Sequence, residues 1–196
     1  MIRYILITII LLIFSNIYSQ ELGIRIGSNI SENSTINKPL IFGININNKI
    51  SNRFDMLVSY DYLHKKQQYS EVDLQEDFNG HNISVSWLYI HNIKQSIGLK
   101  IGISTGYCYY NIASQGLISR WVSEFKAHYL GGSIITGIEY RKLFNLPLSI
   151  EIFFAPSYYY NVSQNIEPII SLTEERNNLK LLNLNLGLKY TFKRNE

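Results

Sequence analysis

The chain lacks the features that stabilise most small exported domains and most helical membrane proteins. Cys108 is its only cysteine, so an internal disulfide framework is impossible. Charged residues account for 17% of the sequence, against about 25% in an ordinary soluble domain. Beyond the N-terminal segment, no apolar run approaches the roughly 20 residues of a transmembrane helix. Disulfide scaffolds and bundles of membrane helices are therefore excluded.

The sequence is equally poor in features that indicate nucleic acid, metals or cofactors. The net charge is only +3 at pH 7, and no basic cluster is interleaved with aromatic residues. The four histidines show neither the HxxxH nor the HExxH spacing of a helical metal site. We therefore expect no nucleic-acid partner, no bound metal and no cofactor.

The first residues have the pattern of a secretory signal peptide. Arg3 supplies the positive end, and residues 5–13 (ILITIILLI) form an apolar core of the usual length. We expect cleavage after about Ser19, which divides the chain into a signal peptide (1–19) and one exported domain (20–196). The apolar core is short for an uncleaved membrane anchor.

What the chain has in abundance is alternation between apolar and polar residues. At 182–192 (LNLNLGLKYTF) every second residue is leucine, tyrosine or phenylalanine. Such a period of two is typical of a β-strand with two different faces, because successive side chains point to opposite sides. Eight segments show it: 22–28, 40–47, 54–63, 81–90, 96–110, 129–140, 148–160 and 182–192.

The links between these segments alternate in length. Those at 29–39, 64–80, 111–128 and 161–178 are long and polar, whereas those at 48–53, 91–95 and 141–147 are short. This alternation predicts an up-and-down antiparallel meander, and closing it into a ring leaves no free strand edge. The sequence therefore predicts an all-β fold, an eight-stranded antiparallel up-and-down transmembrane β-barrel formed by residues 20–196.

The composition of the polar face indicates which side of the barrel it occupies. It is mostly glycine, serine and asparagine, whereas a water-facing surface favours long charged side chains. Small polar residues fit inside an eight-stranded barrel, whose interior is just wide enough for packed side chains. The few charges on this face nearly cancel, so we expect a structural salt-bridge network that plugs a polar interior. Its predicted members are Arg25, Asp55, Asp61, Lys100, Glu139, Glu151 and Lys189.

The apolar face carries aromatic residues near its two ends and aliphatic residues between them. Two aromatic girdles around an aliphatic band are typical of a transmembrane barrel, whereas a soluble calyx would need an apolar interior for its ligand. With the first strand starting on the inner side, the outer girdle comprises Tyr60, Tyr62, Tyr107, Tyr109, Tyr158 and Tyr160. The inner girdle comprises Phe54, Trp87, Tyr89, Tyr140, Tyr190 and Phe192.

This pattern resembles that of the small outer-membrane β-barrel family, which includes the OmpA/OmpX-like and PorT-like barrels. The resemblance rests on the signal peptide, the eight strands, the short inner turns, the long outer loops and a last strand ending Tyr190-Thr191-Phe192. It implies a porin-like membrane protein in the outer membrane of a Gram-negative-type bacterium. It also implies two partners, the outer-membrane lipids and the barrel-insertion machinery, which reads the aromatic end of the last strand.

The predicted function is non-catalytic, with the barrel acting structurally or through its extracellular loops. Envelope integrity, adhesion or an accessory role in export fits this prediction, with a protein partner bound at the loops. One alternative is an enzyme with its site at the outer rim, for which the candidate residues are His64, His81, His128, Ser70, Asp73 and Asp77. The other alternative is a narrow solute channel lined by the internal charges.

Basic residues gather at the expected inner end of the barrel. They are Lys49, Arg53, Lys94, Arg141, Lys142, Lys193 and Arg194, whereas most loop carboxylates lie on the outer side. A basic inner rim suits either anionic phospholipid headgroups or a periplasmic polymer. The sequence leaves both partners open.

Overall fold

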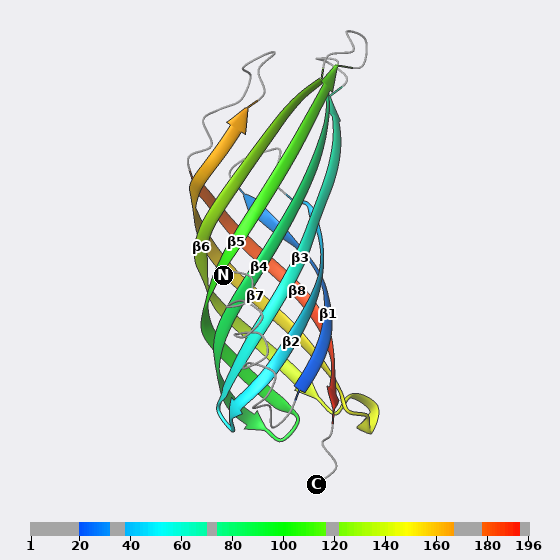
Figure 1. Cartoon of the computed structure of the whole chain (residues 1–196). Helices are drawn as coiled ribbons and strands as arrows, with labels where there is room; N and C mark the ends of the chain where they lie inside the picture. Colours follow the sequence, from blue (N-terminus) through cyan, green and yellow to red (C-terminus); the bar gives the residue numbers. More distant parts are fainter. Residues whose placement is uncertain (1–19, 32–37, 70–73, 117–121, 167–177, 193–196) are drawn as a thin grey trace.

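The computed structural model describes residues 20–31, 38–69, 74–116, 122–166 and 178–192, nearly all of them in eight strands (Figure 1). The strands are β1 (Gln20–Ser31), β2 (Leu40–Ser51), β3 (Phe54–Tyr69), β4 (Leu74–Lys94), β5 (Ile97–Gly116), β6 (Val122–Arg141), β7 (Leu148–Ile166) and β8 (Asn178–Phe192). A 3-10 turn, η2 (Leu143–Asn145), joins β6 to β7. Within these ranges, no helix is long and apolar enough to cross a membrane. The expected signal peptide lies outside the described residues.

The strands follow one another around the ring in sequence order, and the last strand pairs with the first. Along this closing seam, β1 and β8 are antiparallel from Gln20↔Phe192 to Ser31↔Leu181. Closure pairs the two strands that would otherwise be sheet edges. The predicted fold class, an eight-stranded antiparallel up-and-down barrel, is confirmed.

Two of the predicted long outer links are largely strand. β3 and β4 stay paired as far as Tyr69↔Leu74, so residues 70–73 alone separate them. β5 continues to Gly116 and β6 begins at Val122. The prediction of loops over 64–80 and 111–128 was wrong because apolar residues continue with period two among the polar ones. The buried hydrophobic residues of these two segments are Phe78, Ile112, Phe125 and Ala127.

The barrel wall is taller on one side. Pairing of β2 with β3 reaches its outer limit at Leu40↔His64, whereas β3 itself continues to Tyr69. In Figure 1 the outer ends of β3 to β6 rise well above those of β1 and β8. The outward side chains of this extension, such as Lys66 and Gln115, are polar and exposed. The extension therefore has the surface of a segment that stands in water above the membrane.

Below the extension, the outer surface of the barrel is a band of exposed aliphatic side chains. Typical members, each more than half exposed, are Ile24, Ile44, Ile103, Ile134, Ile152 and Leu184. A continuous apolar band of this kind would be costly in contact with water. A hydrocarbon bilayer covers such a band in transmembrane barrels.

The interior contains two apolar clusters in addition to polar layers. The outer cluster consists of Ile41, Leu63, Phe78, Cys108, Tyr110, Ile112, Phe125, Ala127, Tyr129, Tyr159, Leu179 and Leu181. The inner cluster consists of Leu57, Leu88, Ile135, Phe153 and Ala155. The prediction of a polar interior was therefore wrong for these two layers. Part of the outer cluster had been assigned to loops, and other apolar inward residues, such as Leu57 and Ile135, stand singly among polar residues and glycine along their strands.

Candidate functional site

The inner end of the barrel encloses a cluster of buried charges centred on two lysines. Lys189 Nζ lies 2.8 Å from Glu21 Oε2, 2.6 Å from Glu139 Oε1 and 3.1 Å from Glu151 Oε2. Lys100 Nζ lies 3.2 Å from both Glu139 Oε1 and Glu151 Oε2. All five side chains are at most 6% exposed, so the charges face each other and not solvent. Mutual pairing of this kind is what allows ionised groups to remain buried.

Glycines on neighbouring strands make room for these charged side chains. Gly23 of β1 is paired with Lys189 of β8, and a Cβ atom on Gly23 would lie 2.7 Å from Lys189 Cγ. Gly187 is paired with Glu151, and a Cβ atom there would lie 2.9 Å from Glu151 Cγ. These inward glycines therefore mark where long side chains cross the barrel.

Two charged members of the cluster, Glu21 and Arg141, were missed from the sequence, as was the neutral Asn47 that bonds to it. Glu21 receives hydrogen bonds from Lys189 and from Asn47 Nδ2, and Asn47 Nδ2 also donates to Asp55 Oδ2 at 2.8 Å. Arg141 Nε donates to Glu139 Oε2 at 2.8 Å. Glu21 and Arg141 each lie one residue outside a predicted strand. Their parity could have identified them, since Glu21 shares the inward phase of Gly23 and Arg141 that of Glu139.

The remaining two predicted charges, Arg25 and Asp61, form a separate pair nearer the middle of the barrel. The guanidinium of Arg25 donates through Nε and Nη2 to the two carboxylate oxygens of Asp61. Asn82 Nδ2 donates to Asp61 Oδ2 at 3.3 Å. Gly43, opposite both residues, leaves the space, because a Cβ atom there would lie 2.2 Å from Asp61 Oδ1. The seven predicted charges are thus placed inside the barrel, five in the cluster and two in this pair.

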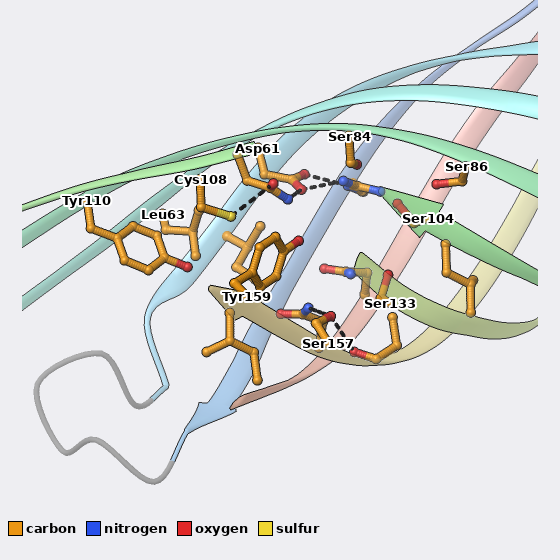
Figure 2. Close-up of a pocket in the computed structure, with 18 residues that line it drawn as sticks. Asp61, Leu63, Ser84, Ser86, Ser104, Cys108, Tyr110, Ser133, Ser157 and Tyr159 are labelled. Carbon is orange, nitrogen blue, oxygen red and sulfur yellow. Dashed lines mark hydrogen bonds and ion pairs between the residues drawn. The ribbon is translucent and has the colours of Figure 1, made fainter. Parts of the chain in front are cut away.

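Beside this pair lies a small polar cavity of about 50 Å³. Its polar lining includes Ser84, Ser86, Ser104, Ser133, Ser157, Asn82, Asn183 and Asn185. Figure 2 shows Ser86 and Ser104 toward one end of it, and Cys108 and Tyr110 toward the other. Residues of the two apolar clusters, among them Leu63, Tyr159 and Ile135, also line it. The cavity has room for a few water molecules and is far smaller than a channel.

The predicted girdle residues lie on the outer surface at the two ends of the aliphatic band. At the inner end, Phe54 and Tyr89 meet edge to face with ring centroids 5.4 Å apart. Tyr190 and Phe192 do so at 5.0 Å. Trp87 and Tyr140 are also exposed there. Aromatic rings at these depths suit the interfaces between hydrocarbon and water.

At the outer end, the girdle is joined to histidines in a continuous row across four strands. Tyr62, His81, Tyr109 and His128 are direct cross-strand neighbours on β3, β4, β5 and β6. Adjacent rings in this row have centroids between 5.0 and 6.2 Å apart. Tyr158 and Tyr160 of β7 pack edge to face at 4.9 Å.

The three histidines proposed for a rim enzyme make hydrogen bonds at this outer girdle: His81 and His128 belong to the row, and His64 stacks on Tyr62. His81 Nδ1 is hydrogen-bonded to the Tyr60 hydroxyl at 2.7 Å, and His128 Nδ1 to that of Tyr107. His64 Nδ1 lies 3.0 Å from Asn79 Oδ1 and 3.6 Å from Asp77 Oδ1. Through Nδ1, these three imidazoles thus bond to tyrosine, asparagine or aspartate side chains of β3, β4 and β5.

Two other rim candidates, Ser70 and Asp73, lie outside the described residues. Within the described residues, no group of three or more His, Cys, Asp or Glu side chains could hold a metal ion.

Comparison with known proteins identifies the fold. Neither the protein-family models nor the curated proteins give a match to this sequence. A major outer membrane protein from Thermus thermophilus is similar over 88% of this chain and 99% of that one, with 8% identity and a TM-score of 0.61. Neisserial surface protein A (NspA) is similar over 89% of this chain and 96% of that one, with 16% identity and a TM-score of 0.51. The chain therefore has the fold of the small outer-membrane β-barrels.

Proposed function

We propose that this chain is a non-catalytic integral outer-membrane barrel that acts structurally or through its outer ends. Its task would be envelope integrity, adhesion or an accessory role in export. Residues 1–19 would direct export as a cleaved signal peptide, and the barrel-insertion machinery would place residues 20–196 in the membrane.

The observation that carries this proposal is the filled interior. At the inner end, two lysines and three glutamates form ion pairs with one another, with side chains at most 6% exposed. At the outer end, the apolar cluster around Tyr110, Tyr129 and Tyr159 packs across the barrel. A solute crossing the barrel would have to displace both layers. The interior of an eight-stranded barrel is just wide enough for its own packed side chains, so no space remains for a solute beside them. The surfaces left for function are the lipid-facing wall and the two ends.

Planar-bilayer recording tests this proposal. The refolded barrel should give no steady conductance above the baseline of the bilayer. Parallel samples run on SDS gels with and without boiling establish that the protein is folded, because a folded barrel changes its migration on heating. Large, stable openings from heat-modifiable protein would contradict the proposal and favour the narrow channel.

A further inference from the structure

The inner rim of the barrel combines exposed apolar tips with basic side chains. Each of the three short inner turns, taken with the strand ends that lead into it, carries a large apolar residue that is more than half exposed. These residues are Ile50 near the end of β2, Ile93 near the end of β4 and Phe144 in η2. A lysine adjoins Ile50 (Lys49) and Ile93 (Lys94), and Lys142 stands two positions before Phe144. Lys94 and Lys142 are exposed, and the Lys49 side chain is 40% exposed. Arg53 is exposed in the first turn as well, so the same combination occurs in all three turns.

Acidic residues at this end of the barrel are arranged in the opposite way. Glu21, Asp55, Glu139 and Glu151 are all buried in the interior, at 1 to 4% exposure. Inside the barrel, the three glutamates form ion pairs with Lys100, Lys189 and Arg141. Among the described residues of the inner rim, the exposed charges are consequently basic. Such a rim is complementary to an anionic surface.

The turn between β6 and β7 holds its apolar tip in a strained conformation. Lys142, Phe144 and Asn145 all have φ between 53° and 61°, although none of them is glycine. A left-handed conformation is unfavourable for a bulky residue such as phenylalanine. Phe144 is also 83% exposed. Figure 1 shows η2 standing out sideways from the wall, beyond the inner end of β6, and not folded beneath the lumen.

We propose that the three inner turns anchor the barrel in the inner leaflet, with Ile50, Ile93 and Phe144 inserted among the acyl chains and the adjacent basic side chains bound to anionic phospholipid headgroups. The proposal rests on the membrane location given above. A periplasmic polymer would satisfy the basic charges but would leave the apolar tips in water. Lipid satisfies both, because an interfacial segment buries apolar side chains while its cations attract anionic headgroups.

The depth of the turn can be measured with a single fluorescent side chain. Phe144→Trp is placed in a Trp87→Phe, Trp121→Phe background and refolded into vesicles that contain phosphatidylglycerol. The introduced indole should be quenched by phospholipid brominated near the top of its acyl chains and should be protected from acrylamide. The matched control is Gln115→Trp on the outer extension, which should show the reverse. Acrylamide quenching of both variants without bromine quenching would overturn the anchor.

The headgroup preference is tested with the variant Arg53→Gln, Lys94→Gln, Lys142→Gln. At low salt, the lipid that contacts the wild-type barrel should be enriched severalfold in phosphatidylglycerol over phosphatidylcholine in mixed vesicles. The triple variant should lose this enrichment. The control Lys66→Gln, Lys126→Gln on the outer extension should keep it. An equal preference in wild type and triple variant would overturn the proposal. Water exposure of the indole, together with charge-dependent binding to peptidoglycan, would overturn the lipid anchor and assign the rim to the polymer.

Heat-modifiable migration separates this proposal from the proposed function. A wild-type chain that never folds into vesicles contradicts the membrane location itself. A chain that folds while its turns stay in water contradicts the anchor alone.

Discussion

Lys189 Nζ donates a hydrogen bond to Glu21 Oε2 at 2.8 Å, joining residues that are 168 positions apart in the sequence. The two side chains lie on the last and the first strand, so their pairing closes the barrel from inside while the backbone ladder of β1 and β8 closes its wall. Lys189 also contacts Glu139 and Glu151, which lie on β6 and β7. One ammonium group thus links four strands around the ring.

Removal of this ammonium group should be strongly destabilising. Lys189→Met removes the cation that pairs with Glu21, Glu139 and Glu151, so these buried carboxylates lose part of their neutralising charge. We expect the free energy of unfolding to fall by roughly 3–5 kcal/mol. The measurement is urea unfolding of the barrel refolded in vesicles. Lys49→Met is the matched control, since Lys49 also pairs with Glu21 but at 3.7 Å and with a side chain 40% exposed. It should cost less than about 1 kcal/mol, and equal losses in the two variants would contradict the cluster.

Charge on the lipid-facing band should impair insertion. Leu186 is exposed on the outer surface of β8, and Leu186→Arg should destabilise the folded barrel by roughly 2–4 kcal/mol. The same unfolding experiment in vesicles gives this value. Gln115→Arg, on the polar extension of β5, should change stability by less than about 0.5 kcal/mol. Equal tolerance of both arginines would show that the apolar band does not face lipid.

The strand extensions should contribute packing energy outside the membrane. Phe125 is 4% exposed within the outer apolar cluster, so Phe125→Ala should cost roughly 3–5 kcal/mol. Gln68 points outward on β3, and Gln68→Ala should change the free energy of unfolding by no more than about 0.5 kcal/mol. Hydrogen exchange on the same variants should show faster opening of the extended parts of β4 to β6 in Phe125→Ala. Similar protection in both variants would indicate that the extension is not a packed structure.

The space at Gly43 should be needed for the Arg25–Asp61 pair. A Cβ atom at Gly43 would lie 2.2 Å from Asp61 Oδ1 and 2.8 Å from Arg25 Cγ, so Gly43→Ala should cost about 1–3 kcal/mol. At Gly106 the closest atom to a Cβ would be 3.0 Å away, and Gly106→Ala should cost less. Thermal unfolding of the two variants, followed by heat-modifiable migration, compares them. A Gly43→Ala barrel as stable as wild type would mean that the ion pair is not formed.

The sequence alone determined the number of strands, their order and the two faces of the wall. The period of two in a segment such as 182–192 is a local property, because each side chain points away from its neighbours whatever the rest of the chain does. The alternation of short and long links then restricted the strands to an up-and-down order. The inward placement of Arg25, Lys100 and Lys189 followed from the same parity.

Only the tertiary structure decided which charges meet and how far the strands extend. Whether Lys189 pairs with Glu21 or with another carboxylate depends on the register between strands that are distant in the sequence, as in Gly23↔Lys189. Local pattern carries no information about that register. The outer apolar cluster was hidden for a related reason. Phe78 and Phe125 stand among polar residues that face water, and the barrel cross-section is what brings them together.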